Sequence, residues 1–477
     1  MSRFVGAVSL LALTGCMTVG PNYHLPKAAL INAPAAGGAF VGTRDNPAIA
    51  QDGLPSHWWR LYQSPDLDRL IIAALAANTD LRVAEANLQR SRALVELAKT
   101  EGQPNVGFEG GVERTQLSAQ QYLFPGNLPV FTLYDINLSA SYELDLFGRI
   151  RRGVEAAKAD DEAVEAARDY VRVSVVADVA KAYVDVCAAG NELAVAQRSL
   201  DLQRQSLALT NRLRDGGRAT DLDQTRSQGL VDQIKANIPA LEARRANALY
   251  RLATLSGRPP AQFESDLVKC VVAPPVSQPI PVGDGAALLK RRPDVRAAER
   301  ELAASTAEIG VATAALYPRV VLGASVGSTG LTSAFLSRPT NDFAVGPSVS
   351  WTINQNPART RIAAAKAVQT AQLARFDGVV LTALRDVESA LNIYAHDLQR
   401  LESLTAAREA SANALADARR LEERGRSGAL ATLDAERTLA SADAAVASLQ
   451  AQIAQDQIAL FLALGGGWQS ETDDSAG

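Results

Sequence analysis

The chain has 477 residues, of which 47% are hydrophobic, 21% charged and 5% aromatic, with a formal net charge of −4 at pH 7. The hydrophobic share is enough for a large core, so wholesale disorder is excluded, and the slightly negative charge gives no electrostatic basis for binding nucleic acid. Three His and three Cys offer little material for a metal centre or a nucleophilic triad. The length predicts two or more ordinary domains or one large elongated body.

Residues 1–15 have the pattern of a signal peptide, with Arg3 followed by a ten-residue, largely apolar run that is too short to cross a hydrocarbon core of ~30 Å. The run leads to Leu-Thr-Gly and Cys16, which resembles the lipobox of bacterial lipoproteins. We therefore expect Cys16 to carry a covalent diacylglycerol and an N-acyl chain, with no other cofactor. An ordinary cleaved signal with an accidental Cys is the alternative. Met17 stands where an Asp would resemble an inner-membrane retention signal, which favours attachment to outer-membrane lipid on the periplasmic face.

The two remaining cysteines have different surroundings. Cys187 lies in a helical pattern, and Cys270 lies beside a Pro-rich segment. An export compartment permits a disulfide, but the sequence favours two unpaired structural thiols.

The most informative feature is an internal repeat. The segment Asp80–Glu85 aligns with Asp294–Glu299, and Ala156–Ala159 aligns with Ala364–Ala367. The distance in sequence between the second pair of aligned segments is six residues shorter than that between the first pair, so the first copy has six more residues than the second. Because insertions collect in surface loops, we expect a loop between Val112 and Ala156 to hold them.

Each copy predicts the same order of elements: a helix, two strands with alternating apolar and polar residues, and a long helical hairpin. Prolines mark a linker between the copies. In chain order we expect a lipidated N-terminal extension and equatorial segment at 16–65, and then repeat 1 at 66–265, with strands at about 104–114 and 132–146 and a hairpin tip near 217. A Pro-rich linker at 266–287 follows. Repeat 2 covers 288–465, with strands at about 318–328 and 343–354 and a tip near 425, and a C-terminal tail covers 466–477.

The helical patterns are very long, and about 60 residues at 1.5 Å each make a rod of ~90 Å. Such a rod cannot bury its apolar stripe inside a compact domain, so it must pack along similar rods. Its many Ala residues allow the close approach that coiled-coil packing requires. The fold class is therefore mainly α, with four membrane strands added.

Four strands of this length suit an outer-membrane barrel, which needs ~9–11 residues per crossing, but bacterial barrels start at ~8 strands. Open edges in lipid leave backbone groups unpaired at several kcal/mol each, so the sheet must close with copies from other chains. Aromatic residues cluster around these segments, as in interfacial girdles. A soluble pair of hairpins is the alternative. The uncharged stretch 320–337 alternates and contains Gly and Ser, which predicts strand and loop and not a transmembrane helix.

Motifs along the whole mature chain carry a resemblance to one family. They are Cys16 with Val19–Tyr23, Trp58–Trp59, Tyr142–Arg149, Leu288–Leu289 with Arg292–Glu299, and Leu464–Trp468. With these motifs the chain resembles the TolC-like outer-membrane factors of tripartite efflux pumps, in particular the outer-membrane lipoproteins of the NodT/OprM type. The resemblance implies a homotrimer, in which a 12-stranded β-barrel of three times four strands stands on a long α-helical coiled-coil periplasmic barrel. It also implies docking to a periplasmic adaptor (membrane fusion) protein and an inner-membrane transporter.

The resemblance assigns two sets of site residues. The closed periplasmic gate of relatives is matched at Leu430, Asp434 and Arg437, whose spacing puts them on one helical face. A solvated Asp–Arg pair is the alternative. The first copy has Arg226 where the second has Asp434, so we expect an asymmetric gate. The hairpin tips that would face the adaptor are matched at Gly216, Gly217, Arg218, Gly425 and Arg426.

The leading functional interpretation is a passive exit duct of a tripartite efflux system that exports drugs, toxic small molecules or metal ions. A pump of the resistance–nodulation–division (RND) type is the favoured source of energy. The outer-membrane channel of a type I protein secretion system is the alternative. A lipid-anchored enzyme is disfavoured, because His24, His57 and His396 lie far apart in sequence without a partner motif. The strand alternation disfavours a purely structural coiled-coil lipoprotein.

Overall fold

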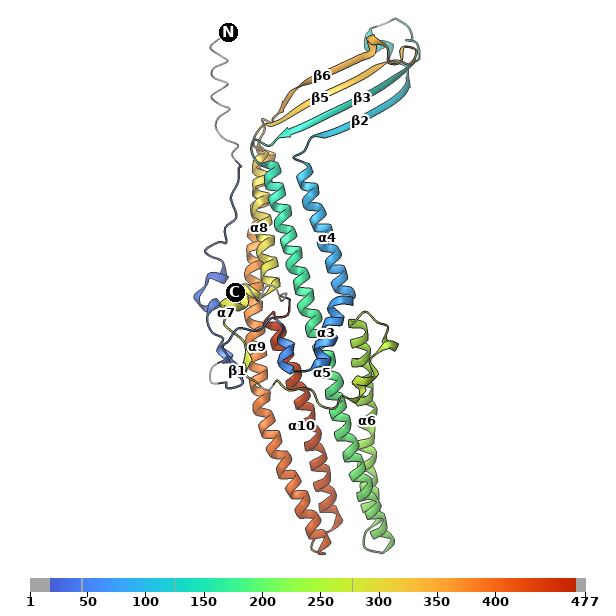
Figure 1. Cartoon of the computed structure of the whole chain (residues 1–477), viewed down its shortest axis with the longest axis vertical. Helices are drawn as coiled ribbons and strands as arrows, with labels where there is room; N and C mark the ends of the chain where they lie inside the picture. Colours follow the sequence, from blue (N-terminus) through green and yellow to red (C-terminus); the bar gives the residue numbers. More distant parts are fainter. Residues whose placement is uncertain (1–17, 44–45, 124, 277, 469–477) are drawn as a thin grey trace. The chain divides into compact units, whose positions relative to one another are not determined.

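The computed structural model describes residues 18–43, 46–123, 125–276 and 278–468, so the expected signal peptide at 1–15 and Cys16 lie outside it. The helices, in chain order, are α2 (Pro34–Gly37), α3 (Pro65–Ala77), α4 (Thr79–Thr100), α5 (Arg149–Asp215), α6 (Asp221–Leu255), α7 (Gly285–Arg291), α8 (Pro293–Ala314), α9 (Asn356–Glu423) and α10 (Ala429–Ala463). They confirm a mainly helical fold with a β part (Figure 1).

The described chain divides into two units, and each takes segments from both repeats because α4, α5, α8 and α9 continue from one unit into the other. Unit 1 contains 18–26, 87–165 and 297–376, and unit 2 contains 27–86, 166–296 and 377–468.

The two copies keep the spacing found in the sequence. Helices α4 and α8 start and end at residues that the repeat aligns, and so do α6 and α10. The connection 116–130 between the strands of the first copy is longer by six than its counterpart, 332–340. This difference matches the insertion in the first copy, so the extra residues lie in this loop.

Unit 1 contains an antiparallel four-stranded sheet in the order β2-β3-β5-β6 (Figure 1). Helices α4 and α8 lead into β2 and β5, while β3 and β6 lead into α5 and α9. All four helix junctions therefore lie at one end of the sheet, and both strand-connecting loops lie at the other. The strands are β2 (Asn105–Thr115), β3 (Phe131–Leu144), β5 (Arg319–Leu331) and β6 (Asn341–Ser350).

The last strand ends four residues before the expected 354. Its final residue, Ser350, pairs with Arg319, the first residue of β5, so the chain beyond it has no ladder partner in β5. Trp351 instead donates its indole N–H to the Leu316 carbonyl oxygen at 3.0 Å. The β5 strand runs three residues past the expected 328, to Leu331, because β3 still supplies partners there.

The linker between the repeats is more ordered than expected. Strand β4 (Ile280–Pro281) pairs in parallel with β1 (Ile49–Ala50) of the N-terminal segment. Helix α7 begins inside the expected linker at Gly285, where the Asp284 carboxylate accepts the Ala287 N–H at 2.8 Å as an N-cap. A helix can start there because the last proline of the linker is Pro281.

The core of unit 2 brings distant motifs together. Trp58, 1% exposed, stacks on Phe461 of α10 with ring centroids 4.5 Å apart. The buried Arg292 guanidinium donates to the carbonyl oxygen of Ala463, the last residue of α10, at 2.9 Å, and binds the Asp294 carboxylate at 2.6 Å. A Cβ at Gly465, which has φ +67°, would lie 2.8 Å from Arg292 Cγ. These motifs thus build the junction between the N-terminal segment, the second repeat and the C-terminal end of α10.

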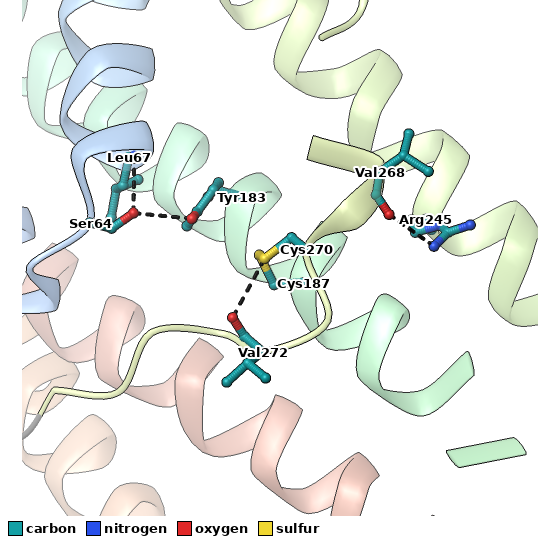
Figure 2. Close-up of a disulfide and its surroundings, with 8 residues drawn as sticks. All are labelled: Ser64, Leu67, Tyr183, Cys187, Arg245, Val268, Cys270 and Val272. Carbon is teal, nitrogen blue, oxygen red and sulfur yellow. Dashed lines mark hydrogen bonds between the residues drawn. A yellow bond between two sulfur atoms is a disulfide. The ribbon is translucent and has the colours of Figure 1, made fainter. Parts of the chain in front are cut away.

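The expectation of two unpaired thiols is wrong. Cys187 of α5 and Cys270 form a disulfide, with Cα atoms 4.7 Å apart (Figure 2). The antiparallel α5–α6 hairpin returns the chain to α5, and Arg245 of α6 donates to the Val268 carbonyl oxygen at 3.2 Å and so holds the linker beside it. Gly190 permits the approach, because a Cβ there would overlap the Cys270 carbonyl oxygen. The long separation of the two cysteines in sequence concealed this proximity.

Candidate functional site

The sheet of unit 1 has one apolar face. The strand register places Phe108, Leu138, Val326 and Phe343 side by side, one from each strand. All four are exposed, and Phe343 is 81% exposed. A continuous exposed apolar row across four strands is the surface that lipid covers in a transmembrane sheet.

The opposite face of the sheet is polar, because successive side chains of a strand alternate between faces. The neighbouring row consists of Glu109, Asn137, Gly327 and Asp342, again one residue from each strand. A polar face behind an apolar one is typical of a barrel wall between lipid and a water-filled bore.

Both edges of the sheet are open. Within the described residues, β2 pairs only with β3 and β6 pairs only with β5. Every residue of β6 is exposed. Long strands with unpaired backbone groups are templates for pairing with another strand.

The segment that follows Cys16 is held against the first turn of α5. The Val19 N–H donates to the Phe147 carbonyl oxygen at 3.1 Å. The buried guanidinium of Arg152 donates to the Val19 and Gly20 carbonyl oxygens at 3.1 and 3.2 Å and to Asn22 Oδ1 at 2.8 Å. This buried clamp could not be identified from the sequence, where Arg152 is one of three arginines at the start of a helical pattern.

The predicted tip residues Gly216, Gly217 and Arg218 lie in the turn between α5 and α6, and Gly425 and Arg426 lie in the turn between α9 and α10. Gly217 has φ +69° and Gly425 φ +68°, the left-handed conformation that favours glycine. A Cβ at either position would meet nothing within 4 Å, so backbone conformation and not packing selects glycine. The bonds that close the turns run from Arg218 N–H to Leu213 O at 2.7 Å and from Arg426 N–H to Leu421 O at 2.8 Å.

The helices that leave the two turns begin differently. Thr220 and Asp223 form a reciprocal capping box at the start of α6. The hydrogen bonds that Thr220 donates to Asp223 lower the pKa of the Asp223 carboxyl, and the one from the Thr220 hydroxyl has the largest effect. The start of α10 has Gly428 at the N-cap, without a side-chain hydrogen bond. The second tip is therefore less firmly capped than the first.

The three predicted gate residues lie on the first turns of α10. Asp434 and Arg437 form an ion pair at 2.6 Å, and both side chains are about two-thirds exposed. Leu430 lies one turn earlier on α10 and is 52% exposed; as an apolar residue it takes no part in the ion pair. In a single chain an ion pair of this exposure adds about 0.3–0.5 kcal/mol, so its position matters more than its strength.

An acidic pair in the α9–α10 hairpin, formed by the buried Asp456 and the half-buried Asp397, was not found from the sequence. Asp456 of α10 is 6% exposed, and its carboxylate accepts a hydrogen bond from Gln452 at 2.8 Å. Burial first, and then Asp397 of α9, raise the pKa of Asp456 from 3.8 to about 6. Asp397 also faces Arg400 at 4.0 Å. The two aspartates lie far apart in sequence, so only the hairpin reveals the pair.

Within the described part of the chain, no group of three or more His, Cys, Asp or Glu side chains is arranged to hold a metal ion. None of the described helices is long and apolar enough to cross a membrane.

The sheet and hairpins define a class of protein: a subunit that supplies part of a membrane β-wall together with long helical hairpins. The comparison with known families agrees with this class. The model of the family described as "Outer membrane efflux protein" matches residues 70–258 and 286–466, and the chain belongs to this family. It is thus an outer-membrane channel component of an efflux system, and the resemblance found in the sequence is confirmed.

Individual relatives match over nearly the whole chain. The outer membrane protein OprJ of Pseudomonas aeruginosa is 31% identical over 473 residues, 96% of this chain and 95% of OprJ. The pyoverdine export outer membrane protein OpmQ of Pseudomonas putida is 30% identical over 439 residues, 91% of this chain and 93% of OpmQ. Among solved structures, the outer-membrane channel OprN is 36% identical with a TM-score of 0.86, covering 95% of this chain and all of OprN.

Proposed function

We propose that three copies of the chain close a 12-stranded barrel in the outer membrane, each supplying one four-stranded sheet. The two open edges, β2 and β6, carry this proposal, because a sheet with an apolar and a polar face cannot leave them unpaired in lipid. Pairing of β6 in one copy with β2 in the next satisfies every edge. The long hairpins of the three copies then form the periplasmic tunnel.

In this assembly the protein acts as a passive exit duct without catalytic chemistry. An inner-membrane transporter, which we propose to be of the RND type, supplies the energy, and a periplasmic adaptor joins it to the turns at Gly217 and Gly425. The cargo consists of drugs, toxic small molecules or metal ions. Type I protein secretion is the alternative.

The experiment is deletion of the gene followed by complementation. We expect the deletion strain to become more sensitive to small toxic compounds or metal ions, and the wild-type chain to restore resistance and to co-purify with an adaptor and an RND transporter. A strain with unchanged sensitivity that fails to secrete one protein would instead support the type I alternative.

We also propose lipidation of Cys16. The clamp formed by Arg152 supports it, because it holds residues 19–22 beside the end of β3, where the sheet leaves the membrane. A short tether from Cys16 would then reach the inner leaflet of the outer membrane. Inhibition of signal peptidase II is expected to leave an uncleaved precursor, and normal processing under that block would refute lipidation.

The gate proposal concerns Leu430, Asp434 and Arg437. Around a threefold axis, three copies of Asp434 would form a ring of carboxylates, and their mutual repulsion is relieved by Arg437 of the same chain at 2.6 Å. Leu430 would add an apolar ring one turn closer to the tip. The exposure of all three side chains in a single copy supports this arrangement.

A further inference from the structure

The loop between β5 and β6, residues 332–340, is attached to one buried tyrosine. Tyr134 of β3 is 1% exposed, and its hydroxyl oxygen accepts the Leu336 N–H at 2.8 Å. The same oxygen lies 2.8 Å from Ser328 Oγ and 2.8 Å from Thr340 Oγ1, which are themselves 2.9 Å apart. The phenol therefore joins β3, β5 near its end, and the middle and C-terminal end of the loop.

The loop folds over the apolar face of the sheet. Tyr134 and Ser328 alternate in register with Leu138 and Val326, so their side chains share the face of the exposed apolar row. Gly330, the cross-strand partner of Tyr134, gives a second indication. A Cβ there would lie 2.5 Å from Thr340 Cγ2, so the loop occupies the space on that face which a side chain would take.

The loop presents two large apolar side chains where a water-facing loop would carry polar ones. Phe335 and Leu336 are each 56% exposed, and the Phe335 ring packs on Tyr134 with centroids 4.8 Å apart. Leu336 has φ +51°, a conformation that costs a leucine energy, and the hydrogen bond from its N–H to Tyr134 stabilises it. A hydrogen bond to the Tyr134 hydroxyl thus helps to hold this exposed apolar pair in place.

The position of Tyr134 along β3, where this pair is held, matches the level of a membrane interface in an outer-membrane barrel. Tyr134 lies eight residues from Tyr142 on β3, about 26 Å along the strand. At the strand tilt of outer-membrane barrels this spans about 20 Å of height, most of the ~25 Å apolar band. Tyr142 is at the helix end of the sheet, so Tyr134 is at the far end, in the outer leaflet. An interfacial tyrosine normally directs its hydroxyl to water and headgroups. Here the hydroxyl is enclosed by the loop.

We propose that the 332–340 loop is a membrane anchor, in which Phe335 and Leu336 insert among the acyl chains of the outer leaflet and take the place of Tyr134 at the lipid surface. The inference rests on the proposed barrel, because the loop continues the lipid-facing apolar row of the same face. The loop lies outside the bore and leaves the mouth of the duct open.

The experiment places a nitroxide label on a single introduced cysteine in the full chain, reconstituted in liposomes that contain lipopolysaccharide. Leu336→Cys is compared with Val326→Cys on the apolar face and Ser325→Cys, its neighbour on the polar face; the parent chain gives the labelling background. Collisions with oxygen, which concentrates in lipid, are measured against collisions with a water-soluble nickel chelate. We expect Leu336→Cys to match Val326→Cys, with an oxygen-to-nickel ratio several-fold above that of Ser325→Cys.

The remaining outcomes are distinguishable. A ratio at position 336 equal to that at position 325 would overturn the anchor and place the loop in water or in the bore. If Val326→Cys itself behaved as water-exposed, the proposed barrel would fail and the anchor with it. Adding Tyr134→Phe, which keeps the ring but removes the hydroxyl, is expected to lower the ratio at position 336 and leave that at position 326 unchanged; no effect at position 336 would show that Tyr134 does not position the loop.

Discussion

The two long hairpins, α5–α6 and α9–α10, share one backbone plan and differ in what holds them. Where the second hairpin pairs the half-buried Asp397 with the buried Asp456, the aligned positions of the first are Ala189 and Ala248, and the first hairpin carries the Cys187–Cys270 disulfide. The tips differ in the same sense: a capping box begins α6, whereas α10 has a bare glycine cap followed by the Asp434–Arg437 pair. Ion pairs join the helices of both hairpins. The distinction is that the first hairpin is also tied covalently to the linker, whereas the second also holds a buried carboxyl with a raised pKa.

The difference bears on gating. Helices that must separate to widen a tunnel cannot be tied permanently to their surroundings, whereas ion pairs and shared protons can be exchanged. The second hairpin is therefore the better candidate for the moving element, and it is also the one that carries the proposed gate residues. Variants in each hairpin test this division between a fixed and an adjustable hairpin.

The largest expected effect is loss of the disulfide. The double variant Cys187→Ser with Cys270→Ser removes a link between positions separated by 83 in sequence, and it should lower the free energy of unfolding by about 4.5 kcal/mol in the chain-entropy description. Denaturant unfolding of the detergent-solubilised protein, with and without reductant, measures it. Reductant should destabilise the wild type and leave the variant unchanged; equal stability of the two proteins would show that the first hairpin is not fixed by this bond.

The second prediction concerns the pH dependence that Asp456 gives to the other hairpin. The folded chain keeps the Asp456 proton up to about pH 6, while an unfolded chain releases it near pH 3.8. The folded state thus binds more protons between these values, so this group makes the free energy of unfolding fall as pH rises through the window, and the loss persists above it. Asp456→Asn, which still accepts from Gln452, should flatten that slope and raise the melting temperature at pH 7.5 by a few degrees.

The control for Asp456 lies in the first hairpin. Ala248→Ser changes the equivalent buried position without adding a titratable group, and it should leave the pH slope as in the wild type. Melting curves of wild type and Asp456→Asn that stay parallel from pH 4 to 7.5 would contradict a proton held between the two aspartates.

The tip glycines give a smaller effect that should be equal in both hairpins. Gly217→Ala and Gly425→Ala each force a side chain into left-handed backbone, at about 1–2 kcal/mol, with no steric clash to add. Thermal unfolding should show similar losses for the two variants. A much larger loss for one of them would mean that its tip makes contacts in the assembly that the single chain does not show.

The smallest effect on stability belongs to the gate. Asp434→Ala with Arg437→Ala should change the free energy of unfolding by no more than about 0.5 kcal/mol. It should nevertheless raise single-channel conductance in planar bilayers, because the charged constriction is removed. Arg226→Ala, at the position of the first hairpin that matches Asp434, is the control and should conduct like the wild type. A conductance unchanged in the double variant would refute the gate assignment.

Much of the fold follows from the sequence because its elements are long and periodic. Alternation located the four strands, and the repeat fixed the equivalence of the hairpins. The features that could not be predicted are those made by tertiary proximity. Cys187 meets Cys270 only after the hairpin returns, and Asp397 faces Asp456 only when two helices pack. The alternation places Tyr134 on the apolar face, but nothing near it in sequence shows that a loop from the second repeat encloses its hydroxyl.

The site was predictable to the same extent. Glycines at the turns and the spacing of Leu430, Asp434 and Arg437 are local patterns. The structure places the glycines in the turns of the two hairpins and the other three residues on the first turns of α10. The Arg152 clamp is not a local pattern, because its acceptors are backbone carbonyls far earlier in the chain, near the N-terminus.

The central claim is that one chain holds a third of a barrel whose edges are satisfied by identical copies. Native mass spectrometry of the protein extracted in mild detergent tests it most directly. We expect a single species of three chains that survives dilution and inserts into bilayers as one conducting unit. A stable monomer that keeps its strands protected from backbone hydrogen exchange would contradict it, since such a chain would have found another way to pair β2 and β6.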